Sequence, residues 1–284
     1  MSQRYRDSEK IMGLNDKEKK LAALLRSYGS VLVAYSGGID STFLAAMAKK
    51  ILGENHLAVT AVSAIRPDDE TKTARAIAKG FNLNHLVINT GELKNKIFLT
   101  NPPDRCFHCK SLLWREMKKT ARDRNISVII EGSTADDQKE YRPGKAASIK
   151  YGIRSPLAEA GLTKAEIRVL AKKMGLPNWN APSNSCLATR IPYGRTIKVS
   201  ELRRIGSSEA FLKKLGFCNL RVRHHGGLAR IEVPMEEFPA AIKRSPNIVK
   251  KLKGLGYKFV TLDLAGYQKG CYDDGKKNAK RKNN

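Results

Sequence analysis

Strand and helix patterns alternate along the first half of the sequence. Four apolar runs typical of buried strands occupy residues 30–35, 57–64, 85–90 and 126–132. Helical patterns occupy residues 15–27, 41–52, 68–81 and 109–124. Strands that are separated by helices of this length run parallel in one sheet. We therefore expect an α/β fold in which helices flank a parallel sheet on both faces.

Polar loops follow three of these predicted strands. They are "SGGIDS" at residues 36–41, "SAIRP" at 63–67 and "EGSTADD" at 131–137. Ligands of such sheets bind outside the carboxyl ends of the strands. The three loops are therefore expected to converge on one crevice.

The first of these loops has the composition of an anion-binding turn. Its two glycines let backbone N–H groups approach a phosphate, and the helix that follows adds its partial positive charge. The hydroxyls of Ser36 and Ser41 can donate hydrogen bonds, and Asp40 can hold a Mg²⁺ ion that bridges phosphates. Neither a Walker A motif nor a Gly-x-Gly-x-x-Gly fingerprint is present. A plain strand-to-helix turn with a capping serine is the alternative.

The second half of the chain has a different organisation. Residues 132–156 are polar and are expected to be irregular, and "LPNWNAPSNSC" at 176–186 is expected to be a linker. A helical pattern near 199–215 then precedes strand patterns at 218–225, 228–234 and 258–264. We expect a small α+β unit with an antiparallel sheet, and we place the domains at residues 1–180 and 181–270, followed by a basic tail at 271–284.

Composition limits the class of protein. The formal net charge of +26 raises the possibility of a nucleic-acid partner, but both halves are basic and only the tail is densely so. The chain has no uninterrupted apolar run of membrane-spanning length, and its first residues are too charged for a signal peptide. We expect a cytoplasmic protein that does not bind membranes, and we favour anionic small molecules over nucleic acid as its partners, with nucleic acid left open. Five cysteines, an odd number, favour metal or redox chemistry over a disulfide framework.

The letters "SGGIDS" resemble the pyrophosphate loop of the ATP pyrophosphatase (PP-loop) superfamily, whose members split ATP between its α and β phosphates. The resemblance implies that residues 1–180 form an ATP-binding domain. The pyrophosphate end of ATP would contact Ser36, Gly37, Gly38, Asp40 and Ser41. Backbone contacts to adenine would come from Ala61 and Ser63, and the nucleotide crevice would include Gly132, Asp136 and Arg142.

Further segments resemble the LarE-type sulfur transferases, in order, between residues 31 and 267. They include "DRCFHCK", "EGSTADDQKEYRPG", "SCLATRIPYG" and "LGFCNLRVRHHG". The resemblance implies an enzyme that adenylylates a carboxylate of a nicotinate-derived pyridinium dicarboxylate mononucleotide and replaces its oxygen with sulfur, for the nickel-pincer nucleotide cofactor. It also implies a homo-oligomer, a hexamer built as a trimer of dimers. A tRNA-thiolating enzyme, or a nucleotide or iron-sulfur binding protein without turnover, is the alternative.

The cysteines bear on the source of sulfur. One branch of the family sacrifices a single cysteine, whose position Cys186 occupies, whereas Cys106 and Cys109 resemble a branch in which three cysteines hold a [4Fe-4S] cluster. Three thiolates leave one iron able to bind an extra sulfide. That sulfur would come from free sulfide or from a donor protein. From the residues alone a zinc site, a redox dithiol and buried structural cysteines remain open for the Cys-x-x-Cys pair. Cys218 and Cys271 are expected to have structural roles.

Two arginines in the second domain are candidates for binding a substrate phosphate. Arg221 and Arg223 alternate with apolar residues, which places both guanidiniums on the face of the strand opposite the core. Paired guanidinium groups bind phosphates through forked hydrogen bonds, and the resemblance implies the same role. A solvated strand face, with Arg230 paired to a residue such as Glu232, is the alternative. The neighbouring histidines, His224 and His225, are expected to be exposed.

Overall fold

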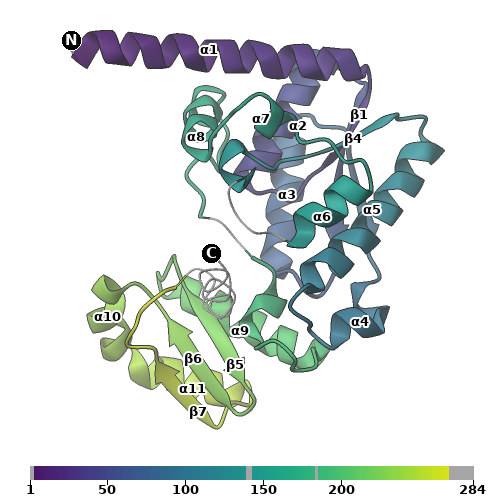
Figure 1. The fold of residues 1–284 in the computed structure, drawn as a ribbon. Helices are drawn as coiled ribbons and strands as arrows, with labels where there is room; N and C mark the ends of the chain where they lie inside the picture. Colours follow the sequence, from purple (N-terminus) through teal and green to yellow (C-terminus); the bar gives the residue numbers. More distant parts are fainter. Residues whose placement is uncertain (1–2, 139–142, 183–184, 269–284) are drawn as a thin grey trace, which may run out of the picture. The chain divides into compact units, whose positions relative to one another are not determined.

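The computed structural model describes residues 3–138, 143–182 and 185–268 (Figure 1). The chain forms two compact units. The first contains residues 1–63, 68–92 and 104–183, and the second contains residues 64–67, 93–103 and 184–284. The second unit thus takes in two short segments from early in the chain, so the units are not two continuous stretches of sequence.

A four-stranded parallel sheet lies at the centre of the first unit. Its strands are β1 (Val31–Ala34), β2 (His56–Val62), β3 (His85–Asn89) and β4 (Val128–Glu131), in the order β3-β2-β1-β4. β1 pairs with β2 and with β4, so the loop that follows β1 has the other two strand ends beside it. The predicted parallel sheet is confirmed.

Helices cover both faces of this sheet (Figure 1). Alternate residues of β1 belong to different cores: Val31 and Val33 pack with α1, α2 and α8, whereas Leu32 packs with α5 and α6. The helices of the unit are α1 (Gln3–Tyr28), α2 (Ile39–Leu52), α3 (Asp68–Gly80), α5 (Arg105–Asp123), α6 (Pro143–Lys150), α7 (Pro156–Glu159) and α8 (Lys164–Lys173). Burial on both sides explains why the strands are continuously apolar.

The second unit contains a three-stranded sheet in the order β5-β6-β7. β5 (Arg221–His225) and β6 (Leu228–Glu232) form an antiparallel hairpin, but β7 (Phe259–Leu262) runs parallel to β6. The expectation of a purely antiparallel sheet is therefore wrong, because a helical crossover returns the chain to the end of the sheet where β6 begins. The helices of the unit are α4 (Lys96–Leu99), α9 (Val199–Lys214), α10 (Phe238–Lys243) and α11 (Ser245–Gly254).

Several elements differ from the sequence-based expectations. α1 begins at Gln3 rather than near residue 15, and the segment expected to be irregular between residues 132 and 156 contains α6. β5 begins at Arg221, three residues later than expected, which leaves Cys218 exposed in the turn before it. None of the helices in the described ranges has the length and apolar character needed to cross a lipid bilayer.

Candidate functional site

The loop between β1 and α2 is a tight turn whose shape depends on Gly37. Gly37 has a φ of +77°, in the left-handed region that favours glycine. A Cβ atom at this position would lie 2.9 Å from the Cβ of Ala74 in α3. The backbone of the loop therefore packs directly against α3, which no larger residue at position 37 would allow.

Two serine hydroxyls organise the interior of this loop. Ser41 Oγ accepts a hydrogen bond from Ser36 N–H (3.2 Å) and lies 3.1 Å from Ser36 Oγ. It also donates a hydrogen bond to the carbonyl of Gly38 (3.0 Å). The backbone N–H of Gly38 in turn donates to Ser36 Oγ, with an N···O distance of 3.3 Å. Asp40 lies in the first turn of α2. The predicted serines, glycines and aspartate therefore share one turn at the N-terminus of a 14-residue helix, which has the features of an anion site.

The end of β4 lies against the start of α2. A Cβ atom at Gly132 would lie 2.9 Å from the backbone nitrogen of Ser41. The preceding residue, Glu131, is buried, and its carboxylate accepts a hydrogen bond from Lys110 Nζ at 2.7 Å. Neither Lys110 nor Glu131 was singled out from the sequence. Gly132, which the sequence analysis did single out, lies beside the β1–α2 loop.

The other predicted nucleotide residues occupy the same edge of the sheet or lie outside the described residues. Ala61 is in β2 and Ser63 directly follows it; Ser63 Oγ is buried without a hydrogen-bond partner among the described atoms. Asp136 is exposed, and its carboxylate accepts a hydrogen bond from the backbone nitrogen of Lys164 (2.7 Å), where α8 begins. Arg142 lies outside the described residues.

Cys106 and Cys109 lie in the first turns of α5, three residues apart and therefore on one face of the helix. Both are half-buried. Cys109 Sγ lies 3.8 Å from Oε1 of Glu92, a carboxylate that is buried in the first unit. His108 pairs with Asp104 at 3.3 Å. The two cysteines thus share one face of α5 near the N-terminus of the helix.

Cys186 belongs to the second unit, where it precedes a short 3₁₀ helix, Leu187–Arg190. Its carbonyl accepts hydrogen bonds from Thr189 Oγ1 (2.8 Å) and from Arg190 Nη1 (3.0 Å). Arg190 is 2% exposed and forms two 2.8 Å hydrogen bonds with the carboxylate of Glu209. A buried, bidentate ion pair therefore holds the loop that carries Cys186.

Arg221 and Arg223 are buried in β5, so the alternative of a solvated strand face is wrong. Arg223 forms two 2.8 Å hydrogen bonds with Glu232, which also contacts Arg230 at 3.2 Å. Burial lowers the pKa of Arg221, and the nearby positive charges of Arg190 and Arg223 lower it further. Arg221 therefore lies beside two guanidinium groups, each of which is paired with a buried carboxylate.

The two histidines of β5 have different environments. His225 is exposed, as expected, but His224 is fully buried, which contradicts the expectation. His224 contacts Glu201 at 3.2 Å and the hydroxyl of Tyr257 at 3.2 Å. His224 therefore shares a face of β5 with the core residue Val222, the face that strand alternation assigns to the core.

The described cysteines form no disulfide, and they are divided between the two units, with Cys106 and Cys109 in the first and Cys186 in the second. Within the described part of the chain, no group of three or more His, Cys, Asp or Glu side chains is arranged to hold a metal ion. Cys271 lies outside the described residues.

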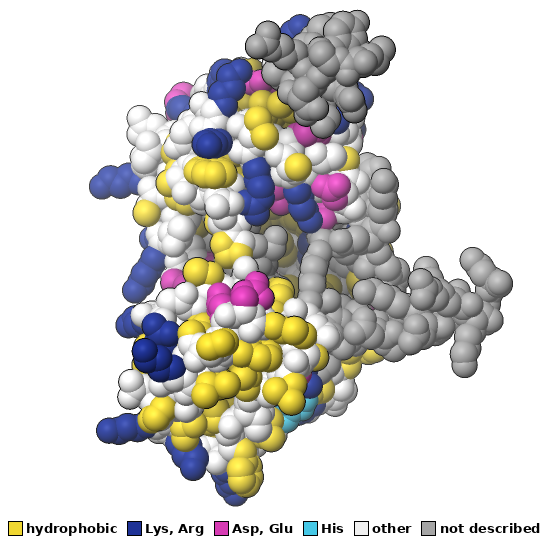
Figure 2. All heavy atoms as spheres, turned by 90° about the vertical axis from the view of Figure 1, so that its left-hand side faces the viewer, with side chains coloured by type: hydrophobic (Ala, Val, Ile, Leu, Met, Phe, Trp, Pro, Cys, Tyr) yellow, Lys and Arg dark blue, Asp and Glu magenta, His cyan; other side chains and the backbone are white. Residues whose placement is uncertain are grey.

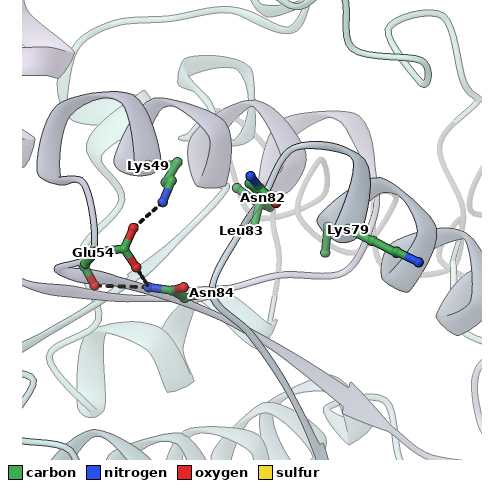
Figure 3. Close-up of a pocket in the computed structure, with 7 residues that line it drawn as sticks. Lys49, Glu54, Lys79, Asn82, Leu83 and Asn84 are labelled. Carbon is green, nitrogen blue, oxygen red and sulfur yellow. Dashed lines mark hydrogen bonds and ion pairs between the residues drawn. The ribbon is translucent and has the colours of Figure 1, made fainter.

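A separate pocket of about 410 Å³ lies at the opposite end of the parallel strands (Figure 3). Its lining includes Lys49 near the end of α2, Lys79 near the end of α3, and Asn84 just before β3. Glu54 bonds to both Lys49 and Asn84, so these polar groups satisfy one another. The pocket is not part of the predicted nucleotide crevice.

Comparisons with known proteins agree with the geometry of the loop. The family model of NAD synthase matches residues 14–124. An uncharacterized protein of Synechocystis sp. is 39% identical over 258 residues, which are 89% of this chain and 96% of that protein. The NH(3)-dependent NAD(+) synthetase of Carboxydothermus hydrogenoformans is 28% identical over 183 residues, 57% of this chain and 71% of that protein.

A further relative has a defined activity in its name. The pyridinium-3,5-bisthiocarboxylic acid mononucleotide synthase of Lactiplantibacillus plantarum is 33% identical over 262 residues, 92% of this chain and 95% of that protein. The similarity covers both units rather than the first unit alone. The chain therefore belongs to the LarE-type family of the PP-loop superfamily, and it is an enzyme that uses ATP and forms AMP and pyrophosphate.

Proposed function

We propose that this enzyme transfers sulfur to a carboxylate of a pyridinium dicarboxylate mononucleotide, in the biosynthesis of a nickel-pincer nucleotide cofactor. One observation carries the proposal: the preformed turn of Ser36, Gly38 and Ser41 occurs in a chain that matches the L. plantarum synthase over 95% of that protein's length. The turn suits the pyrophosphate end of ATP, and the second unit supplies a cysteine and buried arginines.

The chemistry takes two steps. The substrate carboxylate attacks the α-phosphorus of ATP, which forms an acyl adenylate and expels pyrophosphate. A sulfur nucleophile then attacks the acyl carbon, the C–O bond to AMP breaks, and a thiocarboxylate remains. In the first step the loop's N–H groups and hydroxyls would stabilise the departing pyrophosphate, and Asp40 would hold a Mg²⁺ ion on it.

Arg221 and Arg223 are proposed to bind the substrate's phosphate. Arg221 is buried beside two other guanidinium groups; burial lowers its pKa, and repulsion from Arg190 and Arg223 lowers it further. A phosphate dianion placed there would offset that repulsion and would accept forked hydrogen bonds. Arg223 already pairs with Glu232, so its hydrogen bonds would be shared between the Glu232 carboxylate and the substrate phosphate.

Sulfur would come either from Cys186 itself or from sulfide held by a [4Fe-4S] cluster on Cys106, Cys109 and Cys186, and we favour the cluster. Three cysteine thiolates are a suitable set of ligands for such a cluster, because they leave one iron able to bind an additional sulfide. Cys106 and Cys109 lie on one face of α5. When bound, such a cluster supplies sulfur without consuming a side chain.

The test of the function is anaerobic incubation with ATP, Mg²⁺, sulfide and either the pyridinium dicarboxylate mononucleotide or unmodified tRNA. Mass spectrometry is expected to find a thiocarboxylate on the mononucleotide. Ser41→Ala and Asp40→Ala should abolish the product, whereas Ser27→Ala, on the exposed surface of α1, should not. Thiolated tRNA with unchanged mononucleotide would contradict the proposal.

The cysteines can be tested by iron content. Anaerobically purified protein should contain about four irons per chain, and loss of any of the three cysteines should remove them. The exposed Cys218 serves as the control, since Cys218→Ala should leave the iron in place. Iron-free protein that ends a single turnover with dehydroalanine at position 186 would assign the sulfur to Cys186 instead.

A further inference from the structure

Asn178 reaches the phosphate-binding loop from a distant part of the sequence. It lies in the turn that follows α8, and its side chain is 9% exposed. Its amide Nδ2 donates to the carbonyl of Gly37 at 2.8 Å and to Thr42 Oγ1 at 3.0 Å. The carbonyl of Gly37 can only accept, so the nitrogen rather than the oxygen of the amide must face the loop.

The contacts continue through the loop to α3. Thr42, which is 1% exposed, forms a hydrogen bond with Tyr35, and the Tyr35 hydroxyl donates to the carbonyl of Ala74 at 3.0 Å. On this same side Gly37 packs against Ala74. The loop is therefore held by contacts with both α3 and Asn178.

The segment that carries Asn178 is itself anchored. Arg168, in α8, donates to the carbonyls of Trp179 (3.0 Å) and Ala181 (2.9 Å). Lys172 lies 4.8 Å from the centre of the Trp179 ring, a cation–π contact. Since the turn is fixed on α8, the Asn178 amide is a rigid support for the loop.

We propose that Asn178 is a positioning residue for pyrophosphate, an inference that rests on the proposed function of the loop. The carbonyl of Gly37 and the N–H of Gly38 belong to one planar peptide unit and point in opposite directions. Anchoring the carbonyl to Asn178 therefore turns the Gly38 N–H toward the side where the Ser36 hydroxyl lies, at 3.3 Å. That is the side on which the hydroxyls of the loop would meet a phosphate.

The test is calorimetric binding of two separate probes, magnesium pyrophosphate and AMP, to the full-length chain. In Asn178→Ala the dissociation constant for pyrophosphate should rise about fivefold or more, the effect of losing one oriented hydrogen bond, while that for AMP should change less than about twofold. Asn178→Asp, which keeps the volume but turns a second acceptor toward the Gly37 carbonyl, should weaken pyrophosphate binding at least as much. Asn180→Ala is the matched control, because Asn180 lies two residues away and is exposed.

Three results would overturn the inference. Pyrophosphate affinity within about twofold of wild type in both Asn178 variants would show that the anchor has no effect on the loop. Equal weakening of AMP and pyrophosphate, in proportion to a lower melting temperature, would show a purely structural role. Wild-type protein that binds neither probe would refute the proposed ATP site itself, which separates that failure from a failure specific to Asn178.

Discussion

At the scale of single residues, the second unit depends on charges that are buried but paired. Arg190 and Glu209 are 2% and 4% exposed, and Glu209 also accepts a hydrogen bond from the backbone nitrogen of Val222 (3.0 Å). One carboxylate therefore joins the Cys186 loop to β5. Removing one member of such a pair leaves an uncompensated buried charge.

Glu209→Ala should destabilise the protein by about 3–5 kcal/mol, because the Arg190 guanidinium would lose its counter-charge in a desolvated site. Urea unfolding would measure the change. Glu236→Ala, which removes an exposed carboxylate in the same unit, should change stability by less than about 0.5 kcal/mol. An equally small effect for Glu209→Ala would contradict the assignment of a structural ion pair.

His56 should make stability depend on pH. Its Nδ1 lies 2.6 Å from the carbonyl of Gly53 and its Nε2 accepts the backbone N–H of Asn84 (3.1 Å), an arrangement that requires the neutral ring. Burial lowers the pKa of His56 below its ordinary value of 6.5.

The unfolded chain therefore binds a proton more readily than the native state does. The stability contributed by neutral His56 is complete above about pH 6.5 and is lost as the pH falls through that value toward the lower native pKa. Urea unfolding at pH 7.5 and 5.5 should show a smaller loss on acidification for His56→Gln than for wild type. Identical losses would contradict this role.

At the scale of elements, sequence analysis predicted the strands that have a strong local apolar pattern. The strands β1 to β4 are continuously apolar because helices cover both sheet faces, and that pattern is visible without a structure. α8 was missed although the spacing of Thr163 and Glu166 is a capping-box signature, and the structure contains that capping box. β7 was found, but its direction depends on the crossover through α10 and α11, which no local pattern specifies.

The same limit applies to the candidate site. The residues of the Ser36–Ser41 loop are adjacent in sequence and were recognised, whereas Asn178 contacts Gly37 across 141 positions. A lone asparagine within a predicted linker has no sequence signature that marks it as a support. The burial of His224 was also missed, although strand alternation places it on the same face of β5 as Val222, where Glu201 of α9 and Tyr257 contact it.

Thr163→Ala should destabilise the protein by about 1 kcal/mol, because the α8 capping box would lose its hydroxyl acceptor for the backbone N–H of Glu166. The control is Thr73→Ala, at an exposed position within α3, where alanine's higher helix propensity should leave stability equal or slightly higher. Denaturant midpoints for the two variants provide the comparison. Equal midpoints would contradict a role for the cap.

At the scale of the whole molecule, basic residues outnumber acidic ones in both halves of the sequence. Figure 2 shows Lys and Arg side chains scattered over the face in view rather than gathered into one stripe. A net charge of +26 therefore suits attraction of anionic small molecules such as ATP and a phosphorylated substrate. A groove that follows a nucleic-acid backbone would be expected to concentrate those charges.

Family resemblance predicts a homo-oligomer, and a hexamer in particular. Light scattering coupled to size exclusion should give a mass close to six chains at micromolar concentration. A stable monomer under the same conditions would contradict the expectation.

In the proposed reaction, ATP activates a carboxylate before sulfur replaces its oxygen. The most direct measurement follows that oxygen, with ¹⁸O in the carboxylates of the mononucleotide and mass spectrometry of the released AMP. If an acyl adenylate forms, the C–O bond breaks when sulfur attacks, so each AMP produced with a thiocarboxylate should contain one ¹⁸O. Thiocarboxylate formed together with unlabelled AMP would contradict the account.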